Sequence, residues 1–161
     1  AGWMGHEEPF AMDPDYRPAM STERLRVGTP PILQLSVLDA ALDAWDGLSM
    51  DDVRAASIRL SDLFIAEVER LCPTLTLASP RDAGVRGSQV SFRFEHGYSA
   101  IQALIDRGVI GDFRAPDIMR FGFTPLYLDE GDIRAAAEHV ATVINDSLWN
   151  DPKYQTRSRV T

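Results

Sequence analysis

Arg120 is the residue whose type and setting best suit the binding of an anionic ligand. Met119, Phe121 and Phe123 recur around it at the two-residue period of a strand, so one face of that strand is apolar. Arg120 falls on the opposite face beside Gly122, where no bulky side chain follows and a ligand has room. A guanidinium that loses water must be paired, and its planar fork matches a carboxylate. Spacing alone nevertheless favours a structural role, in which the arginine reaches the sheet edge or pairs with a local aspartate.

Composition and charge exclude several classes of function. The 161-residue chain is 45% hydrophobic and carries a net charge of -8 without a run rich in Lys or Arg, so we expect no nucleic-acid or anionic-membrane surface. Cys72 is the only cysteine, which rules out an intrachain disulfide and a cysteine-based zinc site and fits a reducing cytoplasm. Three scattered histidines do not complete a metal site. No apolar stretch approaches the roughly 20 residues needed to span a bilayer.

Hydrophobic periodicity predicts the elements that position Arg120. Two leading helices are expected, both amphipathic, followed by strand, strand, helix, strand, strand and helix. This order predicts an α+β fold, with an antiparallel or mixed sheet and helices packed on one face. The predicted elements are a helix from Ile32 to Gly47, a helix from Ser49 to Pro73, strands at 75–78 and 88–94, a helix at 98–108, strands at 109–113 and 118–124, and a helix from Asp129 to about Trp149.

Three regions follow from this pattern. Residues 1–31 are rich in Gly and Pro and lack a sustained period, so we expect an extended segment that lies over another surface. Residues 32–149 form the α+β domain with its leading helices, and residues 150–161 form a polar tail that we expect to fray. The chain opens without an initiator Met and contains one lysine, Lys153, against fifteen arginines. We therefore expect a piece of a longer protein.

Six blocks of sequence, in this order, resemble a known family. They are Gly2-Trp-Met-Gly-His6, Gly28-Thr-Pro-Pro-Ile32, Ser79-Pro-Arg81, Arg86-Gly-Ser-Gln-Val-Ser-Phe92, Gly108-Val-Ile-Gly-Asp-Phe-Arg114 and Met119-Arg-Phe-Gly-Phe-Thr-Pro-Leu-Tyr127. Together they are similar to the C-terminal part of kynureninases, and the similarity runs from Gly2 to about Leu148. The resemblance implies the small C-terminal domain of a fold-type-I pyridoxal-phosphate enzyme, which has the fold of aspartate aminotransferase.

The resemblance also implies an activity for the intact protein. Kynureninases are cytoplasmic homodimers that hydrolyse L-kynurenine, or 3-hydroxykynurenine, to anthranilate or 3-hydroxyanthranilate and L-alanine, in tryptophan catabolism and NAD biosynthesis. Their pyridoxal 5'-phosphate accepts electrons from the substrate's alpha carbon and is held by a lysine as a Schiff base. Lys153, in the polar tail, is unsuited to this, so the resemblance places that lysine upstream of Ala1, in a large domain that residues 1–31 would cover. The chain alone is then expected to hold no catalytic residue and to be inactive.

Three site residues are carried over from the resemblance. Arg120 matches the arginine that binds the substrate's alpha-carboxylate. Trp3 and Thr29 match positions that contact the cofactor phosphate across the dimer interface, since an indole N–H and a hydroxyl can each donate to a phosphate oxygen. Without the resemblance, Trp3 is better explained as a core or interface aromatic and Thr29 as a turn residue before Pro30.

Three further polar residues are expected to be structural. His6 is interpreted as a surface or packing histidine. Arg81 and Arg86 are expected to hold their positions by pairing with Asp82 or Glu95.

Two other functions stay open on the sequence. One is a sister enzyme of the same fold, of the cysteine desulfurase or selenocysteine lyase type, against which the first and fourth blocks argue. The other is a non-catalytic regulatory domain that binds an amino acid through Arg120. The absence of a suitable lysine favours this second alternative, whereas the opening of the chain in the middle of a motif favours a piece of an enzyme.

Overall fold

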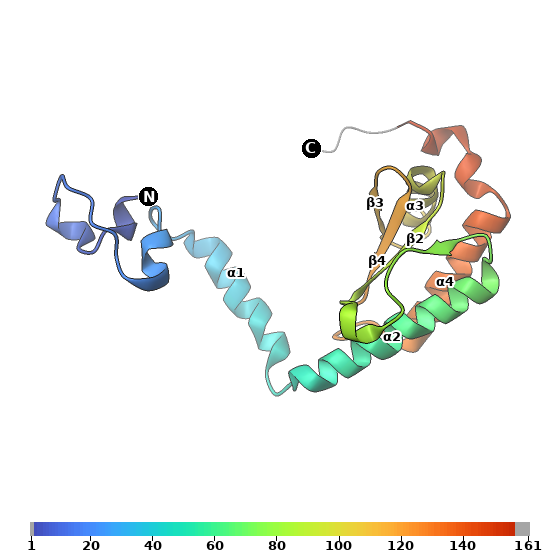
Figure 1. Cartoon of the computed structure of the whole chain (residues 1–161), viewed down its shortest axis with the longest axis horizontal. Helices are drawn as coiled ribbons and strands as arrows, with labels where there is room; N and C mark the ends of the chain where they lie inside the picture. Colours follow the sequence, from blue (N-terminus) through green and yellow to red (C-terminus); the bar gives the residue numbers. More distant parts are fainter. Residues whose placement is uncertain (1, 157–161) are drawn as a thin grey trace. The chain divides into compact units, whose positions relative to one another are not determined.

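The computed structural model describes residues 2–156 (Figure 1). The chain divides into two compact units, Ala1–Gly47 and Leu48–Thr161, and each is described by itself. Ala1 of the predicted first segment and residues 157–161 of the predicted polar tail lie outside the described residues. The first unit contains helix α1 (Ile32–Leu42), which the sequence analysis had grouped with the sheet.

The first unit is a series of short turns followed by one helix. Turns of 3₁₀ helix span Trp3–Gly5, Pro9–Ala11 and Ser21–Leu25, and a further one, Asp43–Trp45, follows α1. The beginning and end of the turn region meet through their backbones, because a Cβ on Gly2 would lie only 1.8 Å from the carbonyl oxygen of Val27. Only glycine permits that approach.

Helix α1 was wrongly predicted to be amphipathic. Its sequence, Ile-Leu-Gln-Leu-Ser-Val-Leu-Asp-Ala-Ala-Leu, places apolar side chains on every side of the helix, and none of its residues is buried. The spacing that suggested a single apolar face passed over Leu33 and Val37, which lie on the other side and are 81% and 70% exposed.

The second unit has the predicted α+β fold. Its four strands form one antiparallel sheet in the order β1-β2-β4-β3. In this register Arg120 on β4 has Ser91 of β2 on one side and Asp112 of β3 on the other. The elements are α2 (Met50–Leu71), β1 (Thr76–Leu77), β2 (Gln89–Arg93), α3 (Gly97–Ile105), β3 (Asp112–Arg114), β4 (Ile118–Gly122) and α4 (Glu130–Asn145).

The two long helices begin at the predicted residues, and the side chains there cap them. The Ser49 hydroxyl accepts from the amides of Asp51 and Asp52, at 3.2 and 3.5 Å, and so caps α2. Asp129 and Asp132 form a reciprocal capping box at the start of α4. These local signals fix where each amphipathic helix starts, and burial of its apolar face then holds it in place.

Helices α2, α3 and α4 share one core on one face of the sheet. Phe64 of α2 contacts Phe92 of β2 and Phe121 of β4, with ring centroids 6.2 and 5.1 Å apart. A Cβ on Gly97, at the start of α3, would lie 3.2 Å from the Met119 side chain of β4. Phe92, Met119 and Phe121 point to the same side of the sheet, so Arg120 points to the other side, away from this core.

The segment after α4 is docked rather than frayed, so the prediction for residues 150–156 is wrong. Helix α4 ends at Asn145, before the predicted end near Trp149. Tyr154 is only 7% exposed and its hydroxyl donates to Asp106 of the α3 C-terminus at 2.9 Å. Lys153 pairs with the same carboxylate at 3.1 Å. One buried ring can anchor a polar segment, and a single ring leaves no periodic signal in the sequence.

Candidate functional site

Strand β4 places Arg120 on the sheet face away from the core. Its strand neighbours Met119 and Phe121 are 0% and 6% exposed, whereas 28% of the Arg120 side chain is exposed. Gly122 follows on the Arg120 face, and a Cβ added there would meet no atom within 4 Å. The predicted contrast between an apolar face and a face with an open space beside the arginine is confirmed.

The guanidinium of Arg120 pairs with the carboxylate of Asp112, which lies directly opposite it on β3. The Nη2 atom of Arg120 donates to Oδ2 of Asp112, and Nη2 of Arg114 lies 3.3 Å from the same oxygen. The hydrogen bond from Arg120 lowers the pKa of the Asp112 carboxyl, with smaller contributions from the charges of Arg120 and Arg114. The local ion pair that spacing alone favoured is therefore present.

The Nε atom of Arg120 is an unsatisfied donor. It is shielded from solvent and has no hydrogen-bond partner among residues 2–156. A buried donor without a partner costs about 1 to 3 kcal/mol, so such an atom in a folded protein often marks a place completed by a ligand, ion or water. Arg120 thus retains hydrogen-bonding capacity that Asp112 does not use.

Two polar residues of β2 lie beside Arg120 on the same sheet face. Ser91 is directly opposite Arg120 and is 9% exposed, and Gln89 is directly opposite Gly122. The Nε2 atom of Gln89 donates to Oγ of Ser91 at 3.3 Å. A guanidinium, an amide and a hydroxyl around the open space over Gly122 together suit a carboxylate, whose oxygens only accept hydrogen bonds.

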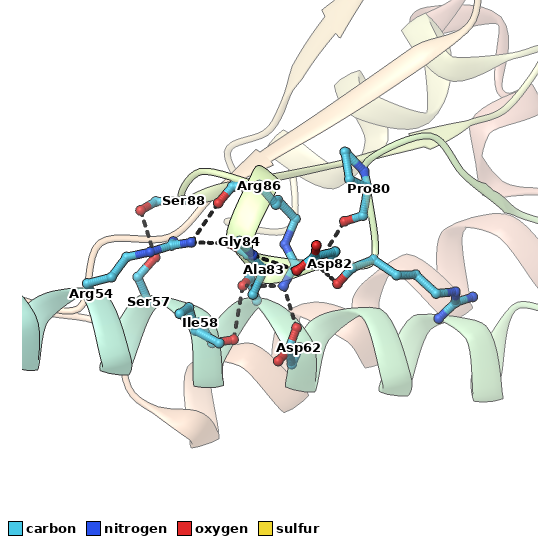
Figure 2. A network of polar contacts seen from close by, with 12 residues as sticks. Arg54, Ser57, Ile58, Asp62, Pro80, Asp82, Ala83, Gly84, Arg86 and Ser88 are labelled. Carbon is cyan, nitrogen blue, oxygen red and sulfur yellow. Dashed lines mark hydrogen bonds and ion pairs between the residues drawn. The ribbon is translucent and has the colours of Figure 1, made fainter.

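A buried arginine, Arg86, fixes the loop that leads into β2 (Figure 2). Only 2% of its side chain is exposed. Its Nη1 donates to the carbonyl oxygens of Pro80 and Arg81, at 2.9 and 2.8 Å. Its Nη2 donates to the Asp62 carboxylate and, at 3.2 Å, to the Ser61 hydroxyl, both on α2. Arg86 therefore ties both ends of its own loop to the helix.

A second arginine continues this connection toward the strand beside Arg120. Figure 2 shows Arg54 of α2 reaching the loop, where it donates to the carbonyl oxygens of Ala83 and, at 2.8 Å, of Arg86. At the start of the loop, Oγ of Ser79 accepts from the Ser91 amide at 2.8 Å. The loop that the two arginines hold thus contacts the backbone of Ser91, the residue opposite Arg120.

Arg81 and Arg86 do not take their predicted partners. Arg81 pairs with Glu69 and Arg86 pairs with Asp62, both on α2. Asp82 instead accepts from the Gly84 amide within the loop. The partners are more than ten residues away along the chain, so only the packing of the loop on the helix reveals them.

Trp3 and Thr29 lie near the contact between Gly2 and Val27 in the first unit. Trp3 is 50% exposed, with its ring packed edge-on against Phe10 at 5.7 Å between centroids, and Thr29 is exposed. Within the described residues, neither the indole N–H nor the hydroxyl donates a hydrogen bond. Both donors are therefore free to bind an anion.

A hollow of about 470 Å³ adjoins Trp3 but does not suit a phosphate. Its wall includes the acidic side chains of Glu8 and Asp13 and does not include Thr29. A dianion would be repelled there, so this hollow is a poor site for a phosphate.

His6 packs in the first unit, in agreement with the packing alternative. It is 7% exposed, and its Nδ1 accepts from the Glu8 amide at 2.8 Å. The other ring nitrogen, Nε2, therefore carries the proton and donates to the Asp15 carbonyl oxygen at 3.1 Å. Both nitrogens are used in holding the turns together.

No other cluster in the described part of the chain suggests chemistry. Burial raises the pKa of the Cys72 thiol to about 11, so this residue stays a neutral, inert thiol. Residues 2–156 contain no group of three or more His, Cys, Asp or Glu side chains placed to hold a metal ion. None of the described helices combines the length and apolar character needed to cross a membrane.

Comparison with known proteins assigns the family. The family model described as Kynureninase C-terminal domain matches residues 53–140, which is more than half of the chain. The chain belongs to the kynureninase family. Kynureninases of Pseudomonas fluorescens, Burkholderia mallei (strain SAVP1) and Burkholderia pseudomallei (strain K96243) are each 44% identical to it over 163 residues. The alignments cover 100% of this chain and 39% of each relative, so the chain spans about two-fifths of the length of these kynureninases.

The kynureninase match bears differently on the three predicted site residues. Arg120 lies within the region that the family model matches. Trp3 and Thr29 precede that region, although the alignments with the relatives include them. Arg120 belongs to the second unit and the other two residues to the first, so their common site stays a prediction.

Sequence reasoning missed Asp112, the closest charged neighbour of Arg120. The pair depends on the β3–β4 register, in which Asp112 is opposite Arg120 and Arg114 is opposite Ile118. The predicted strand at 109–113 contained Asp112, but its pairing register was not assigned. A hairpin centred on 115–117 is the signal that would have placed the aspartate beside the arginine.

Proposed function

We propose that the intact protein is a pyridoxal-phosphate-dependent kynureninase, which hydrolyses L-kynurenine, or its 3-hydroxy derivative, to the corresponding anthranilate and L-alanine. Membership of the kynureninase family supports this function over the sister enzymes and over a regulatory domain. The structural observation that carries it is Arg120, with an unsatisfied Nε and an open space over Gly122. An alpha-amino acid presents the carboxylate that this group would recognise.

In this proposal the residues of the chain supply binding and orientation. Arg120 holds the substrate's alpha-carboxylate, and the amide of Gln89 lies across the open space beside it. Trp3 and Thr29 donate to the phosphate of the cofactor through side-chain groups that are otherwise free. The cofactor, when bound, accepts the electron pair released at the substrate's alpha carbon. Fixing the carboxylate limits rotation of the substrate and so aligns the bond that is to be broken.

The remaining features of this proposal follow from the family. We assign the intact protein to tryptophan catabolism and NAD biosynthesis, as a homodimer in the cytoplasm. The buried, unpaired Cys72 is compatible with a reducing compartment. Helix α1 exposes apolar side chains on every side, which is compatible with a larger assembly because such a surface is normally covered.

Substitution of Arg120 in the full-length protein tests the proposed function. Arg120→Ala and Arg120→Lys should each cost about 2 to 4 kcal/mol in kcat/KM for L-kynurenine, and Lys should restore little because an ammonium lacks the two-pronged geometry. Steady-state kinetics measure the loss, and thermal melts show whether the variants are folded.

Arg93→Lys is the matched control, because Arg93 is also on the sheet and pairs with Asp117 at 3.0 Å. It should keep the wild-type kcat/KM. Wild-type kcat/KM in both Arg120 variants would refute the role of Arg120 in substrate binding.

A further inference from the structure

The way in which Asp112 binds Arg120 obstructs a second carboxylate. A guanidinium can bind a carboxylate in a bidentate manner on either of two edges. One edge is formed by Nε and Nη2 and the other by Nη1 and Nη2. The Nη2 atom belongs to both edges, and it is the atom that donates to Oδ2 of Asp112. Nη2 carries one N–H on each edge, so a ligand carboxylate on either edge shares this nitrogen with Asp112 and is repelled by its negative charge.

Asp112 is nevertheless an incomplete partner for Arg120. It takes up Nη2 alone and leaves the shielded Nε without any acceptor in the described part of the chain. A carboxylate that spans Nε and Nη2 would satisfy both donors, and so would gain the hydrogen bond that the present pair lacks. The ion pair with Asp112 is thus the weaker of the two arrangements open to this guanidinium.

Asp112 also has a second cation within reach. Its Oδ2 is 3.3 Å from Nη2 of Arg114, and 46% of its side chain is exposed. If Asp112 leaves Arg120, its carboxylate keeps Arg114 as a positive partner and becomes better solvated, so its negative charge stays compensated. The neighbouring pair of Arg93 and Asp117 has no such alternative partner in the described residues.

We propose that Asp112 is an internal stand-in for the substrate's carboxylate, which occupies Arg120 in the ligand-free protein and is released to Arg114 when the substrate binds. The inference rests on the proposed function, because it takes Arg120 as the group that binds the alpha-carboxylate. Asp112 then acts as a specificity residue. Ligands that bring a carboxylate displace it, whereas ligands without one leave Arg120 closed.

Asp112 as a competitor and Asp112 as a support predict opposite effects of its loss. A support would orient Arg120 toward the ligand, and its loss would weaken substrate binding. A competitor subtracts from the binding free energy of the substrate, and its loss would strengthen binding. The unsatisfied Nε favours the competitor, because a dedicated support would be expected to use the donor that points into the protein.

The test is the isosteric substitution Asp112→Asn in the full-length holoenzyme. The neutral amide should lower KM for L-kynurenine about three- to five-fold, a modest change because the lost ion pair is half-exposed. The decarboxylated amine of the same substrate, used as a competitive inhibitor, should keep its wild-type inhibition constant. Asp117→Asn removes another Asp–Arg pair from the sheet and should change neither value.

The outcomes separate this inference from the proposed function. An unchanged or raised KM in folded Asp112→Asn would overturn the competitor role, and so would an equal gain in affinity for the decarboxylated amine. A wild-type KM in Arg120→Lys would instead refute the binding of the carboxylate by Arg120. Thermal melts of Asp112→Asn and Asp117→Asn compare the two lost ion pairs and confirm that each variant is folded.

Discussion

Trp3 offers an indole N–H, and Thr29 a hydroxyl, that no other group in the described residues uses. If both donate to the cofactor phosphate, Trp3→Phe and Thr29→Val should each weaken cofactor binding while preserving most of the side-chain volume. A hydrogen bond to a charged group is worth about 1.5 to 3 kcal/mol, so each dissociation constant should rise roughly ten-fold or more. Titration of the full-length apoenzyme with pyridoxal 5'-phosphate, followed by absorbance, measures this.

Trp45→Phe provides the control for the tryptophan substitution. Trp45 belongs to the same unit and is 39% exposed, and it has no assigned contact with the cofactor. Its substitution should leave the dissociation constant at the wild-type value. Wild-type affinity in both Trp3→Phe and Thr29→Val would show that these donors do not reach the phosphate.

The neighbourhood of Arg120 shows which parts of a site a sequence can predict. The alternation of Met119 and Phe121 with Arg120 was sufficient to place the arginine on the open face, because side chains of a strand alternate strictly. The same alternation did not reveal Asp112 or Ser91, which approach from the two neighbouring strands. Cross-strand partners depend on pairing register, and register is fixed by the whole sheet.

Among the elements, the loop between β1 and β2 depends on one buried charge. Arg86→Lys should destabilise the second unit by about 2 to 4 kcal/mol, because an ammonium cannot reach Pro80, Arg81 and Asp62 together and leaves buried carbonyl oxygens without donors. Chemical denaturation of the 161-residue chain, followed by circular dichroism, measures the loss as a shift of the midpoint.

Arg81→Lys is the matched control for the loop. Arg81 belongs to the same loop and also pairs with an acid on α2, but 67% of its side chain is exposed. An exposed pair contributes less than about 1 kcal/mol, so the midpoint should hardly move. Equal shifts in the two variants would show that Arg86 is no more important to the loop than a surface residue.

The accuracy of the predicted elements varied with the kind of signal. Helix starts at Ser49 and Asp129 were correct because a cap is a local interaction between residues close in sequence. The prediction that α1 is amphipathic was wrong, because hydrophobic periodicity was counted on one side of a helix that has apolar side chains on every side. The docking of Tyr154 was missed because it depends on Asp106, a residue far away along the chain.

For the molecule as a whole, the supply of a lysine is the decisive chemical question. Lys153 is the only lysine of the chain, and it lies in the exposed segment after α4. The Tyr154 hydroxyl and the Asp106 carboxylate raise the pKa of the Lys153 ammonium above its ordinary value. An amine must lose its proton before it can attack an aldehyde, so Lys153 is a poor nucleophile near neutral pH.

The 161-residue chain should therefore form no stoichiometric adduct at Lys153 when it is incubated with pyridoxal 5'-phosphate at pH 7 to 8 and reduced with borohydride. Peptide mass spectrometry locates any adduct, and Lys153→Arg sets the background from other amines. The chain should also not hydrolyse L-kynurenine, because the roles proposed for Arg120, Trp3 and Thr29 are to bind and orient, and none of them would hold the cofactor covalently. A full adduct at Lys153 accompanied by turnover would contradict this assignment, since it would make this segment the centre of the reaction. Adduct without turnover would show only that the ion pair with Asp106 opens often enough to expose a reactive amine.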